Sequence, residues 1–261
     1  KNNLFLTIKG RNNDGSKFIS HALNKGARYI VSSKVEKKYR KKTLKVKNEI
    51  LFLNKFAKLK RENSLAKIIA ITGSAGKTSL KNLIKQLLQN FAKTHSSPKS
   101  YNNHLGVPIS LSNLSVEDKY GIFEIGMSKK GEIDNLSKLI KPHIGIITNI
   151  GEAHIENFSN IHGIAKAKSE IINSIEKNGT IILNRDDKFF NFLRKKAKLK
   201  KLKIITFGKN KKSDIFPLIF LKSSYSTRVI FKVKKEKINL EFKNINIYNI
   251  MAALAVIKEL N

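Results

Sequence analysis

The sequence predicts a mixed α/β fold: a mostly parallel sheet of the P-loop type with a small antiparallel hairpin, preceded by a partial small α/β domain. Over residues 63–261, runs that are apolar throughout alternate with amphipathic segments. Such runs are typical of parallel strands that helices cover on both faces. At residues 68–79 an apolar run leads through a glycine-containing turn into Lys-Thr-Ser. That order places backbone N–H groups and a lysine at a helix N-terminus, where a phosphate can bind.

Residues 1–62 predict the partial N-terminal domain, and the polar stretch Lys60–Ser64 marks its boundary. Apolar runs, a serine cap and glycine stops define its elements. These are a strand at Leu4–Ile8, a helix from Ser16 that Gly26 ends, a strand at Tyr29–Val31, an exposed basic run at Lys34–Lys47 and a helix at Ile50–Leu59. We expect this unit to begin within a domain.

Residues 63–261 predict a central domain in which strands and helices alternate. The helix after the phosphate loop has one apolar face, formed by Leu80, Leu83, Ile84, Leu87, Leu88 and Phe91. Later strands are expected at Tyr120–Ile125, Ile144–Ile150, Thr180–Leu183 and Lys203–Phe207, and helices at Glu132–Ile140, Asn160–Glu176 and Asp186–Lys198. The end of the chain predicts a hairpin at Arg228–Val233 and Ile238–Phe242 and a helix at Ile247–Leu260.

Composition limits the class of protein. A net charge of +33 is compatible with a nucleic-acid-binding module, but the charge is mostly lysine and no aromatic residues interleave with it to stack bases. A solvated lysine surface is the simpler interpretation. The absence of cysteine excludes disulfides, and no apolar run is long enough to span a bilayer. A cytoplasmic protein with no membrane insertion is expected.

The phosphate loop is the first candidate site. Its candidate nucleotide-binding residues are Thr72, Gly73, Ser74, Ala75, Gly76, Lys77, Thr78 and Ser79. Lys77 supplies a positive charge, and the hydroxyl of Thr78 suits a phosphate-bound Mg²⁺. The strict Walker pattern requires glycine where this chain has Ile71, so the motif alone also allows a nucleotide-binding scaffold without catalysis.

Two further candidates follow predicted strands, at the sheet edge where ligands of such folds bind. Glu124 ends an apolar strand, where a carboxylate needs a cation, a hydrogen-bond donor or a surface lysine. His154 follows the Ile144–Ile150 strand and serves either as a structural histidine or as a ligand. Together with Thr78, these side chains are compatible with a divalent cation bound to a nucleotide.

Lys168 stands in the middle of the apolar stripe of the predicted helix Asn160–Glu176. A lysine at such a position either extends its amine to the surface or is buried with a lowered pKa. A neutral amine can react with carbon dioxide to form a carbamate, which binds metal as a carboxylate does. Separately, Asn102 and Asn103 precede a Gly turn and Pro108, an arrangement that either caps a helix or holds a sugar or diphosphate.

Several ordered motifs together resemble the Mur ligase family. Thr72-Gly73-Ser74-Ala75-Gly76-Lys77-Thr78 is similar to its phosphate loop, which lacks the first Walker glycine. The segments that resemble the MurF branch of the family are Asn102–Pro108, Glu124–Met127 with Gly131–Ile133, Thr148–Glu156 and Ala165–Ile171. The resemblance covers nearly the whole chain and makes residues 1–62 similar to the end of a UDP-sugar-binding domain.

The resemblance implies an ATP-dependent, ADP-forming amide ligase of peptidoglycan synthesis, and hence of cell wall biogenesis, cell shape and cell division. Such an enzyme joins D-Ala-D-Ala to UDP-MurNAc-tripeptide through an acyl phosphate. Another Mur-type or folylpolyglutamate-type ligase and a basic nucleotide-regulated nucleic-acid-binding module are the alternatives. A monomer is expected, with no nucleic acid partner.

Roles carried over by resemblance complete the predicted site. Lys77, His154 and Lys168 would be catalytic, and Thr72–Ser79, Asn184 and Asn249 would bind ATP, with Asp186 or Asp187 near adenosine. The implied cofactors are ATP, two Mg²⁺ ions and a carbamylated Lys168. The metal ligands would be Thr78, Glu124, His154 and Lys168, and Asn102 and Asn103 would face the UDP-linked substrate.

The sequence departs from the family pattern in three places. Lys99-Ser100 replaces Gly-Asn, and Tyr248 and Ala252 replace the histidine and second asparagine of H-N-x-x-N. The third departure is that the family's C-terminal domain, with its D-x-Y-N-A-x-P segment, lies outside this sequence. We therefore expect the chain alone to be unable to complete the reaction.

Overall fold

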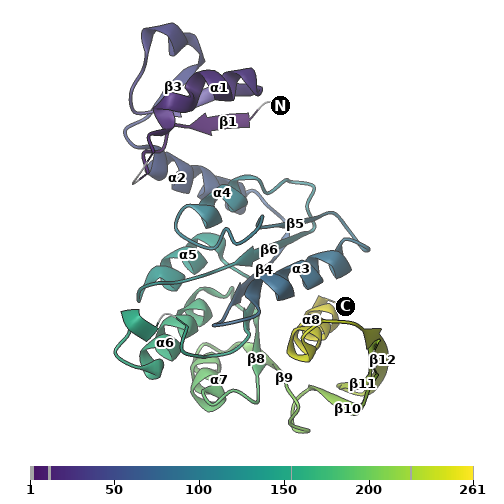
Figure 1. Cartoon of the computed structure of the whole chain (residues 1–261). Coiled ribbons are helices and arrows are strands. Elements are labelled where there is room, and N and C mark those ends of the chain that lie inside the picture. The colour runs from purple at the N-terminus through teal and green to yellow at the C-terminus, as the bar shows by residue number, and fades with distance from the viewer. Residues whose placement is uncertain (1–2, 11–12, 154, 224, 261) are drawn as a thin grey trace. The chain divides into compact units, whose positions relative to one another are not determined.

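The computed structural model describes residues 3–10, 13–153, 155–223 and 225–260. The chain divides into two compact units, Lys1–Leu59 and Lys60–Asn261 (Figure 1). The candidate His154 lies outside the described residues.

The N-terminal unit contains a parallel sheet in the order β1-β2-β3. Its elements are β1 (Asn3–Leu6), a 3₁₀ helix (Gly15–Phe18), α1 (Ile19–Asn24), β2 (Ala27–Ser32), a second 3₁₀ helix (Lys37–Lys42), β3 (Thr43–Lys45) and the start of α2 (Glu49–Glu62). The basic run is mostly exposed, as expected, and it also contains β3, where Leu44 pairs with Val31. One prediction needs correction: α2 continues to Glu62, into the segment predicted to be a linker.

The second unit is built on one mixed sheet, whose described strands follow the order β12-β11-β10-β9-β8-β7-β4-β6-β5. The strands from β5 to β10 pair in parallel, and β10, β11 and β12 pair antiparallel. The strands are β4 (Lys67–Thr72), β5 (Thr94–Ser96), β6 (Tyr120–Glu124), β7 (Ile144–Ile147), β8 (Thr180–Asn184), β9 (Lys203–Phe207), β10 (Ile215–Lys222), β11 (Thr227–Val233) and β12 (Glu236–Phe242).

Helices cover both faces of this sheet (Figure 1). The helices α3 and α8 pack against each other on one face, and α4, α5, α6 and α7 lie on the other. Their bounds are α3 (Lys77–Leu88), α4 (Gly106–Ser112), α5 (Glu132–Ile140), α6 (Ile161–Lys168), α7 (Phe190–Leu199) and α8 (Ile247–Leu260). Two-sided burial explains why Ile68, Ile69 and Ile71 of β4 are all fully buried. The predicted fold class is confirmed.

The strand register brings the polar residues together at the carboxyl edge of the sheet. Ile71 pairs with Glu124 of β6, and Thr72 pairs with Ile147 of β7. The phosphate loop therefore leaves the sheet between the ends of two neighbouring strands, as expected where a parallel sheet binds a ligand.

The antiparallel part is larger than the predicted hairpin because β10 adds a third strand. Pro217 within an apolar run argues against a strand, since proline donates no ladder hydrogen bond. The structure accommodates it at an irregularity in the pairing with β11, between Pro217 and Ile219. Among the described residues, β10 pairs with β9 at Ile215, and Pro217 lies outside that pairing.

Helix limits also differ from the predictions. The expected helix Asn160–Glu176 is α6 followed by a 3₁₀ helix at Ser169–Ser174. The helix expected from Asp186 begins at Phe190. Asp187 accepts the backbone N–H of Phe189 in the preceding turn, and Asp186 accepts the N–H of Lys209 in the loop after β9. The helix α3 ends at Leu88, and Phe91 beyond it is exposed.

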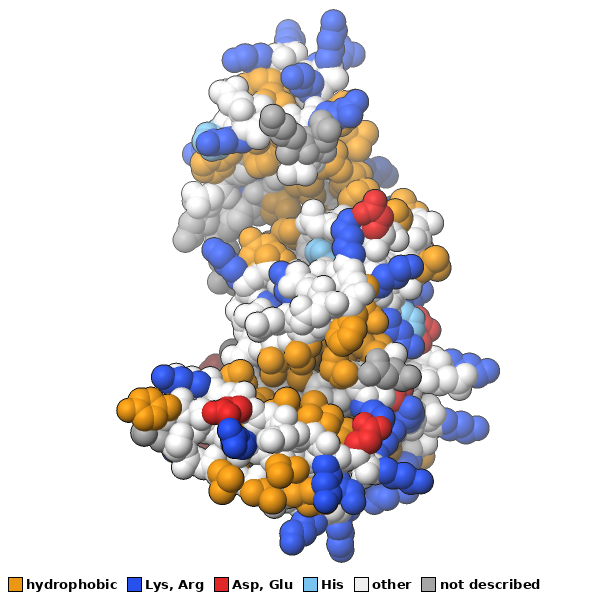
Figure 2. All heavy atoms as spheres, turned by 90° about the vertical axis from the view of Figure 1, so that its right-hand side faces the viewer, with side chains coloured by type: hydrophobic (Ala, Val, Ile, Leu, Met, Phe, Trp, Pro, Cys, Tyr) orange, Lys and Arg blue, Asp and Glu red, His pale blue; other side chains and the backbone are white. Residues whose placement is uncertain are grey.

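The distribution of charge on the surface bears on the nucleic-acid-binding interpretation of the composition. Lysine and arginine side chains are scattered over the face drawn in Figure 2 and do not form one patch. This distribution favours a solvated surface over a defined nucleic-acid-binding site. Among the described residues, no helix combines the length and apolar character needed to cross a bilayer.

The antiparallel strands offer a test of where the core ends. Phe231 of β11 is fully buried, whereas Phe220 of β10 is 52% exposed. We expect Phe231→Ala to lower the free energy of unfolding by roughly 3–5 kcal/mol, because it leaves a cavity. Phe220→Ala is the matched control, with an expected loss under about 1 kcal/mol. Equal losses in urea unfolding experiments would contradict this account of the core.

Candidate functional site

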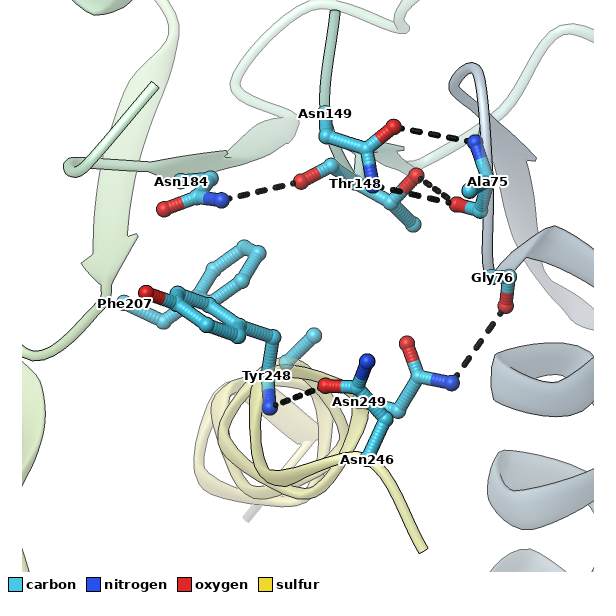
Figure 3. Close-up of a pocket in the computed structure, with 10 residues that line it drawn as sticks. Ala75, Gly76, Thr148, Asn149, Asn184, Phe207, Asn246, Tyr248 and Asn249 are labelled. Carbon is cyan, nitrogen blue, oxygen red and sulfur yellow. Dashed lines mark hydrogen bonds between the residues drawn. The ribbon is translucent and has the colours of Figure 1, made fainter. Parts of the chain in front are cut away.

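The phosphate loop is held by the loop that follows β7. The Ser74 hydroxyl donates to the carbonyl of Gly151 at 2.9 Å and accepts from the N–H of Gly151 at 2.8 Å. The N–H of Ser74 donates to the Asn149 carbonyl, and that of Ala75 donates to Asn149 Oδ1 at 2.9 Å. Thr148 Oγ1 completes the junction by donating to the Ala75 carbonyl at 2.7 Å (Figure 3). We call this set of contacts the loop junction.

Two glycines make the loop junction sterically possible. Gly73 has a φ of 148°, and a Cβ there would lie 1.9 Å from Thr148 Oγ1. Gly76 has a φ of 81° and is the N-cap of α3, so it turns the chain into the helix. Ile71, by contrast, lies inside β4 and is fully buried. The missing Walker glycine thus falls on a strand position, where its conformational freedom is not required.

Lys77 begins α3 and turns back to the loop, where its ammonium donates to the Gly73 carbonyl at 2.8 Å. Burial lowers the pKa of Lys77, and the negative charge of Glu124 partly opposes that effect. Lys77 therefore places a cation between the phosphate loop and the carboxylate at the end of β6. A phosphate would be a stronger partner for this ammonium than a neutral carbonyl is.

Thr78 and Glu124 form the second part of the site. Thr78 Oγ1 donates to Glu124 Oε2 at 2.7 Å, and Asn102 Nδ2 donates to Glu124 Oε1 at 2.8 Å. Glu124 is only 1% exposed, so its charge depends on these donors and nearby lysines. A hydroxyl beside a carboxylate is an oxygen donor set that suits Mg²⁺. These residues therefore fit a magnesium ion held next to a bound phosphate.

Lys168 is buried rather than extended to the surface. Its side chain is 2% exposed at the end of α6. Burial, followed by repulsion from Lys77, lowers the pKa of Lys168 to about 7. Of the two interpretations open from the sequence, the structure favours the lowered pKa. The amine therefore loses its proton far more readily than an ordinary lysine, and the charge of Lys77 contributes to this effect.

A pocket lies beside the loop junction, between the ends of β8 and β9 and the start of α8 (Figure 3). Its lining residues are Ala75, Gly76, Thr148, Asn149, Asn184, Phe207, Asn246, Tyr248, Asn249 and Ala252. Asn184 Nδ2 donates to the Thr148 carbonyl at 3.2 Å, and Asn249 Nδ2 lies 3.5 Å from the Gly76 carbonyl. The two predicted adenosine-side asparagines thus line one space that opens onto the phosphate loop.

Two acidic residues near this pocket accept hydrogen bonds from neighbouring segments. Asp187 accepts the N–H of Ile150 at 2.6 Å, and Asp186 accepts the Tyr248 hydroxyl at 3.1 Å. Burial and then the contact with Asp186 raise the pKa of the Tyr248 phenol. The tyrosine that replaces the family's histidine is therefore fixed as a neutral aromatic wall.

The remaining predicted site residues have mixed positions. Thr72 is buried, and its Oγ1 has no hydrogen-bond partner among the described residues. Ser79 is exposed on the first turn of α3. Asn103 Oδ1 accepts the N–H groups of Leu105 and Gly106, so it holds the turn that leads into α4. For Asn103 a local structural role therefore explains the contacts that the structure contains.

Sequence reasoning missed Phe207 and Lys81 as parts of the site. Phe207 ends a predicted strand, so the rule applied to Glu124 and His154 also pointed to it. Lys81 follows Lys77 by four residues and thus lies on the same face of the helix. Asn149 comes at the end of the predicted strand Ile144–Ile150 and was expected on the ligand side, but its contacts with Ser74 and Ala75 depend on the spacing between two loops.

Comparisons with known proteins bear on the family and the fold. The sequence profile of the Mur ligase middle domain matches residues 71–257. The UDP-N-acetylmuramoyl-tripeptide–D-alanyl-D-alanine ligase of Rickettsia prowazekii is 38% identical over 244 residues, which are 93% of this chain and 52% of that protein. The chain thus spans about half the length of the curated relatives it matches.

Solved structures agree with the sequence comparison. A crystal structure of MurF from Acinetobacter baumannii is 30% identical, with a TM-score of 0.85, and covers 98% of this chain and 56% of that one. MurF from Thermotoga maritima, solved in complex with ADP, is 27% identical with a TM-score of 0.85. That match covers 100% of this chain and 60% of the other.

The buried amine of Lys168 predicts a pH-dependent stability. An unfolded lysine keeps its proton up to about the ordinary pKa of 10.5, whereas the folded chain releases it near 7. The unfolded state therefore binds more protons between these values, and the destabilisation by Lys168 is largest below pH 7 and fades toward pH 10.5. We expect Lys168→Met to raise the free energy of unfolding by roughly 1–3 kcal/mol at pH 7.

Urea unfolding at several pH values measures this effect. The gain from Lys168→Met should shrink as the pH rises toward 10. Lys166→Met is the matched control, because Lys166 lies on the same helix and is exposed; it should change stability by less than about 0.5 kcal/mol. A destabilised Lys168→Met protein at pH 7 would contradict the buried, deprotonated lysine.

Proposed function

This chain belongs to the Mur ligase family, and from that premise we propose that the full-length protein is an ATP-dependent ligase that joins D-Ala-D-Ala to UDP-MurNAc-tripeptide. Relatives that cover nearly the whole chain carry this activity in their names. The proposal places the protein in peptidoglycan synthesis in the cytoplasm, with ATP as the source of energy.

The observation that carries the proposal is the arrangement of three features at one edge of the sheet. The phosphate loop ends in Lys77, Thr78 pairs with the buried Glu124, and the buried Lys168 is influenced by the charge of Lys77. A phosphate loop alone supports nucleotide binding. The buried carboxylate and an amine with a lowered pKa add what a carboxylate-activating enzyme requires.

The proposed reaction has two steps. A terminal carboxylate oxygen of the tripeptide bonds to the γ-phosphorus of ATP while the bond to the bridging oxygen breaks, which releases ADP. The neutral amine of D-Ala-D-Ala then attacks the acyl carbon, the carbon–oxygen bond to phosphate breaks, and the amine loses a proton as the amide forms. Charge neutralisation and alignment are the main demands of the first step.

The chain's own residues meet these demands in distinct ways. Loop N–H groups at the start of α3 and the Lys77 ammonium would bind the phosphates. Thr78 and Glu124 would hold one Mg²⁺, and the carbamate of Lys168 with His154 would hold a second. Bound Mg²⁺ supplies neutralisation of the phosphate charge. Asn102 keeps the Glu124 carboxylate oriented through its 2.8 Å hydrogen bond.

The pocket beside the loop junction is proposed to take the adenosine. Asn184 and Asn249 line it together with the aromatic rings of Phe207 and Tyr248. The flat faces of the rings and the amide groups suit a purine and its ribose. We further propose that residues 1–62 contribute to binding of the UDP-sugar and that residues 63–261 form the ATP-binding domain. The monomeric state remains a prediction from the sequence.

A ligation assay tests the proposed function directly. The full-length protein, incubated with ATP, Mg²⁺, UDP-MurNAc-tripeptide and D-Ala-D-Ala, should release phosphate only when the dipeptide is present. Lys77→Ala should reduce turnover at least about 100-fold, because it removes the cation at the phosphates. Lys85→Ala on the same helix is the control, with turnover near wild type. Absence of dipeptide-dependent release would refute the assignment, and turnover with glutamate instead would support a different ligase.

Lys168 allows a more specific test of the carbamate. Lys168→Ala should abolish turnover in the same assay, because no carboxylate-like group remains at that position. Added short carboxylic acids should then restore part of it by occupying the space of the missing side chain. Lys166→Ala, treated in parallel, should need no rescue. Near-normal turnover of Lys168→Ala would show that the lysine is not required.

A further inference from the structure

Lys81 is a fully buried cation next to the candidate site, and the proposed reaction leaves it without a role. Its side chain is 1% exposed on α3, one turn beyond Lys77. The ammonium donates to the carbonyl of Ser97 at 2.7 Å and also to the carbonyl of Lys99. Burial lowers the pKa of Lys81, and the negative charge of Glu124 opposes this effect.

The two carbonyl partners of Lys81 belong to the loop that joins β5 to α4. We call residues 97–103 the β5–α4 loop. Lys99 has a φ of 45°, in the left-handed region that residues other than glycine rarely adopt. A hydrogen bond from a buried ammonium to the Lys99 carbonyl offsets the cost of that conformation.

The same loop reaches the Thr78–Glu124 pair at three points. The Ser97 hydroxyl accepts the backbone N–H of Glu124 at 3.3 Å. The Ser100 hydroxyl lies 3.4 Å from Thr78 Oγ1. Asn102 Nδ2 donates to Glu124 Oε1 at 2.8 Å. The position of Glu124 therefore depends on the shape of the β5–α4 loop.

We propose that Lys81 is a positioning residue, which holds the β5–α4 loop in the shape that presents Ser100 and Asn102 to the Thr78–Glu124 pair. This inference rests on the proposed function, since it assigns the pair to a nucleotide-bound Mg²⁺. Lys81 acts indirectly. Its ammonium binds backbone carbonyls of the β5–α4 loop, and side chains of that loop contact the Thr78–Glu124 pair. Ser100, which replaces the family's asparagine, thereby becomes a part of the metal-binding surface.

The chemistry of lysine explains why this position carries no apolar residue. An ammonium has three N–H donors, so one side chain can satisfy both loop carbonyls. Methionine has a similar length and fills the same space, but it leaves these carbonyls without that donor. Lys81→Met therefore removes the loop contacts while it preserves most of the packing of this buried side chain of α3.

Hydrogen–deuterium exchange of the metal-free and nucleotide-free chain gives the first readout. In Lys81→Met the backbone amides of residues 99–103 should exchange about tenfold faster than in wild type, because the loop opens more often. Lys85→Met is the matched control on the same helix and should leave these amides unchanged. Unchanged loop exchange in Lys81→Met would overturn the proposal. Should Lys81→Met fail to fold, Lys81→Leu, which also lacks an N–H donor, replaces it under the same criterion.

Binding of a fluorescent ATP analogue, with Mg²⁺ and with EDTA, gives the second readout. In EDTA, the affinity of Lys81→Met for the analogue should stay within about twofold of wild type. Mg²⁺ should raise that affinity about tenfold less in Lys81→Met than it does in wild type. An equal loss in both buffers, or none in either, would contradict a role directed at the metal pair. Failure of wild type to bind the analogue would instead refute the proposed nucleotide site, whereas the exchange experiment tests the loop independently.

Discussion

The loop junction between the phosphate loop and the loop after β7 is the constraint on which the rest of the site depends. The parallel register of β4 and β7 brings the two strand ends together. Ser74, Thr148 and Asn149 then join them through short hydrogen bonds. The absence of a side chain at Gly73 is what permits this approach, since a Cβ there would overlap the Thr148 hydroxyl. The same junction sets the start of α3 and forms one wall of the pocket.

The lysines of this chain fall into an exposed group and a small buried group. The sequence contains 52 lysine and arginine residues, and among the described residues Lys81 and Lys168 are the lysines that are fully buried. Burial is the main cause of the lowered pKa of both, while the charge of Glu124 acts on Lys81 and the charge of Lys77 acts on Lys168. Exposed lysines explain the net charge, whereas Lys77 and the buried Lys81 place positive charge beside the phosphate loop. An anionic phosphate would relieve that concentration of charge.

The sequence was sufficient for features that depend on local pattern. The parallel core, the turn at Gly73 and Gly76, and the anomalous Lys168 all follow from periodicity or from residue type. Features that depend on contacts between distant segments could not be predicted from the sequence. The strand β10 was not predicted. Its Pro217 is typical of a segment outside a sheet, and only the structure shows that Pro217 lies at an irregularity in the pairing with β11 and outside the pairing with β9. Lys81 was passed over because its carbonyl partners come from another loop.

The Ile71 position shows how structure changes the meaning of a motif. By sequence it breaks the Walker pattern, and only the family resemblance removed the objection. In the structure Ile71 is a fully buried strand residue that pairs with Glu124 and Ile146. An isoleucine at this position therefore contributes to the core, and it keeps β4 regular up to the point where the loop begins.

The claim at the centre of this account is that the phosphate loop and Lys77 form a cradle for a diphosphate. Calorimetric titration of the chain with ADP and with AMP, both in the presence of Mg²⁺, tests it most directly. The account predicts binding of one ADP per chain, with AMP at least about 100-fold weaker and with that difference lost in Lys77→Ala. Equal affinity for ADP and AMP in the wild-type chain would contradict it.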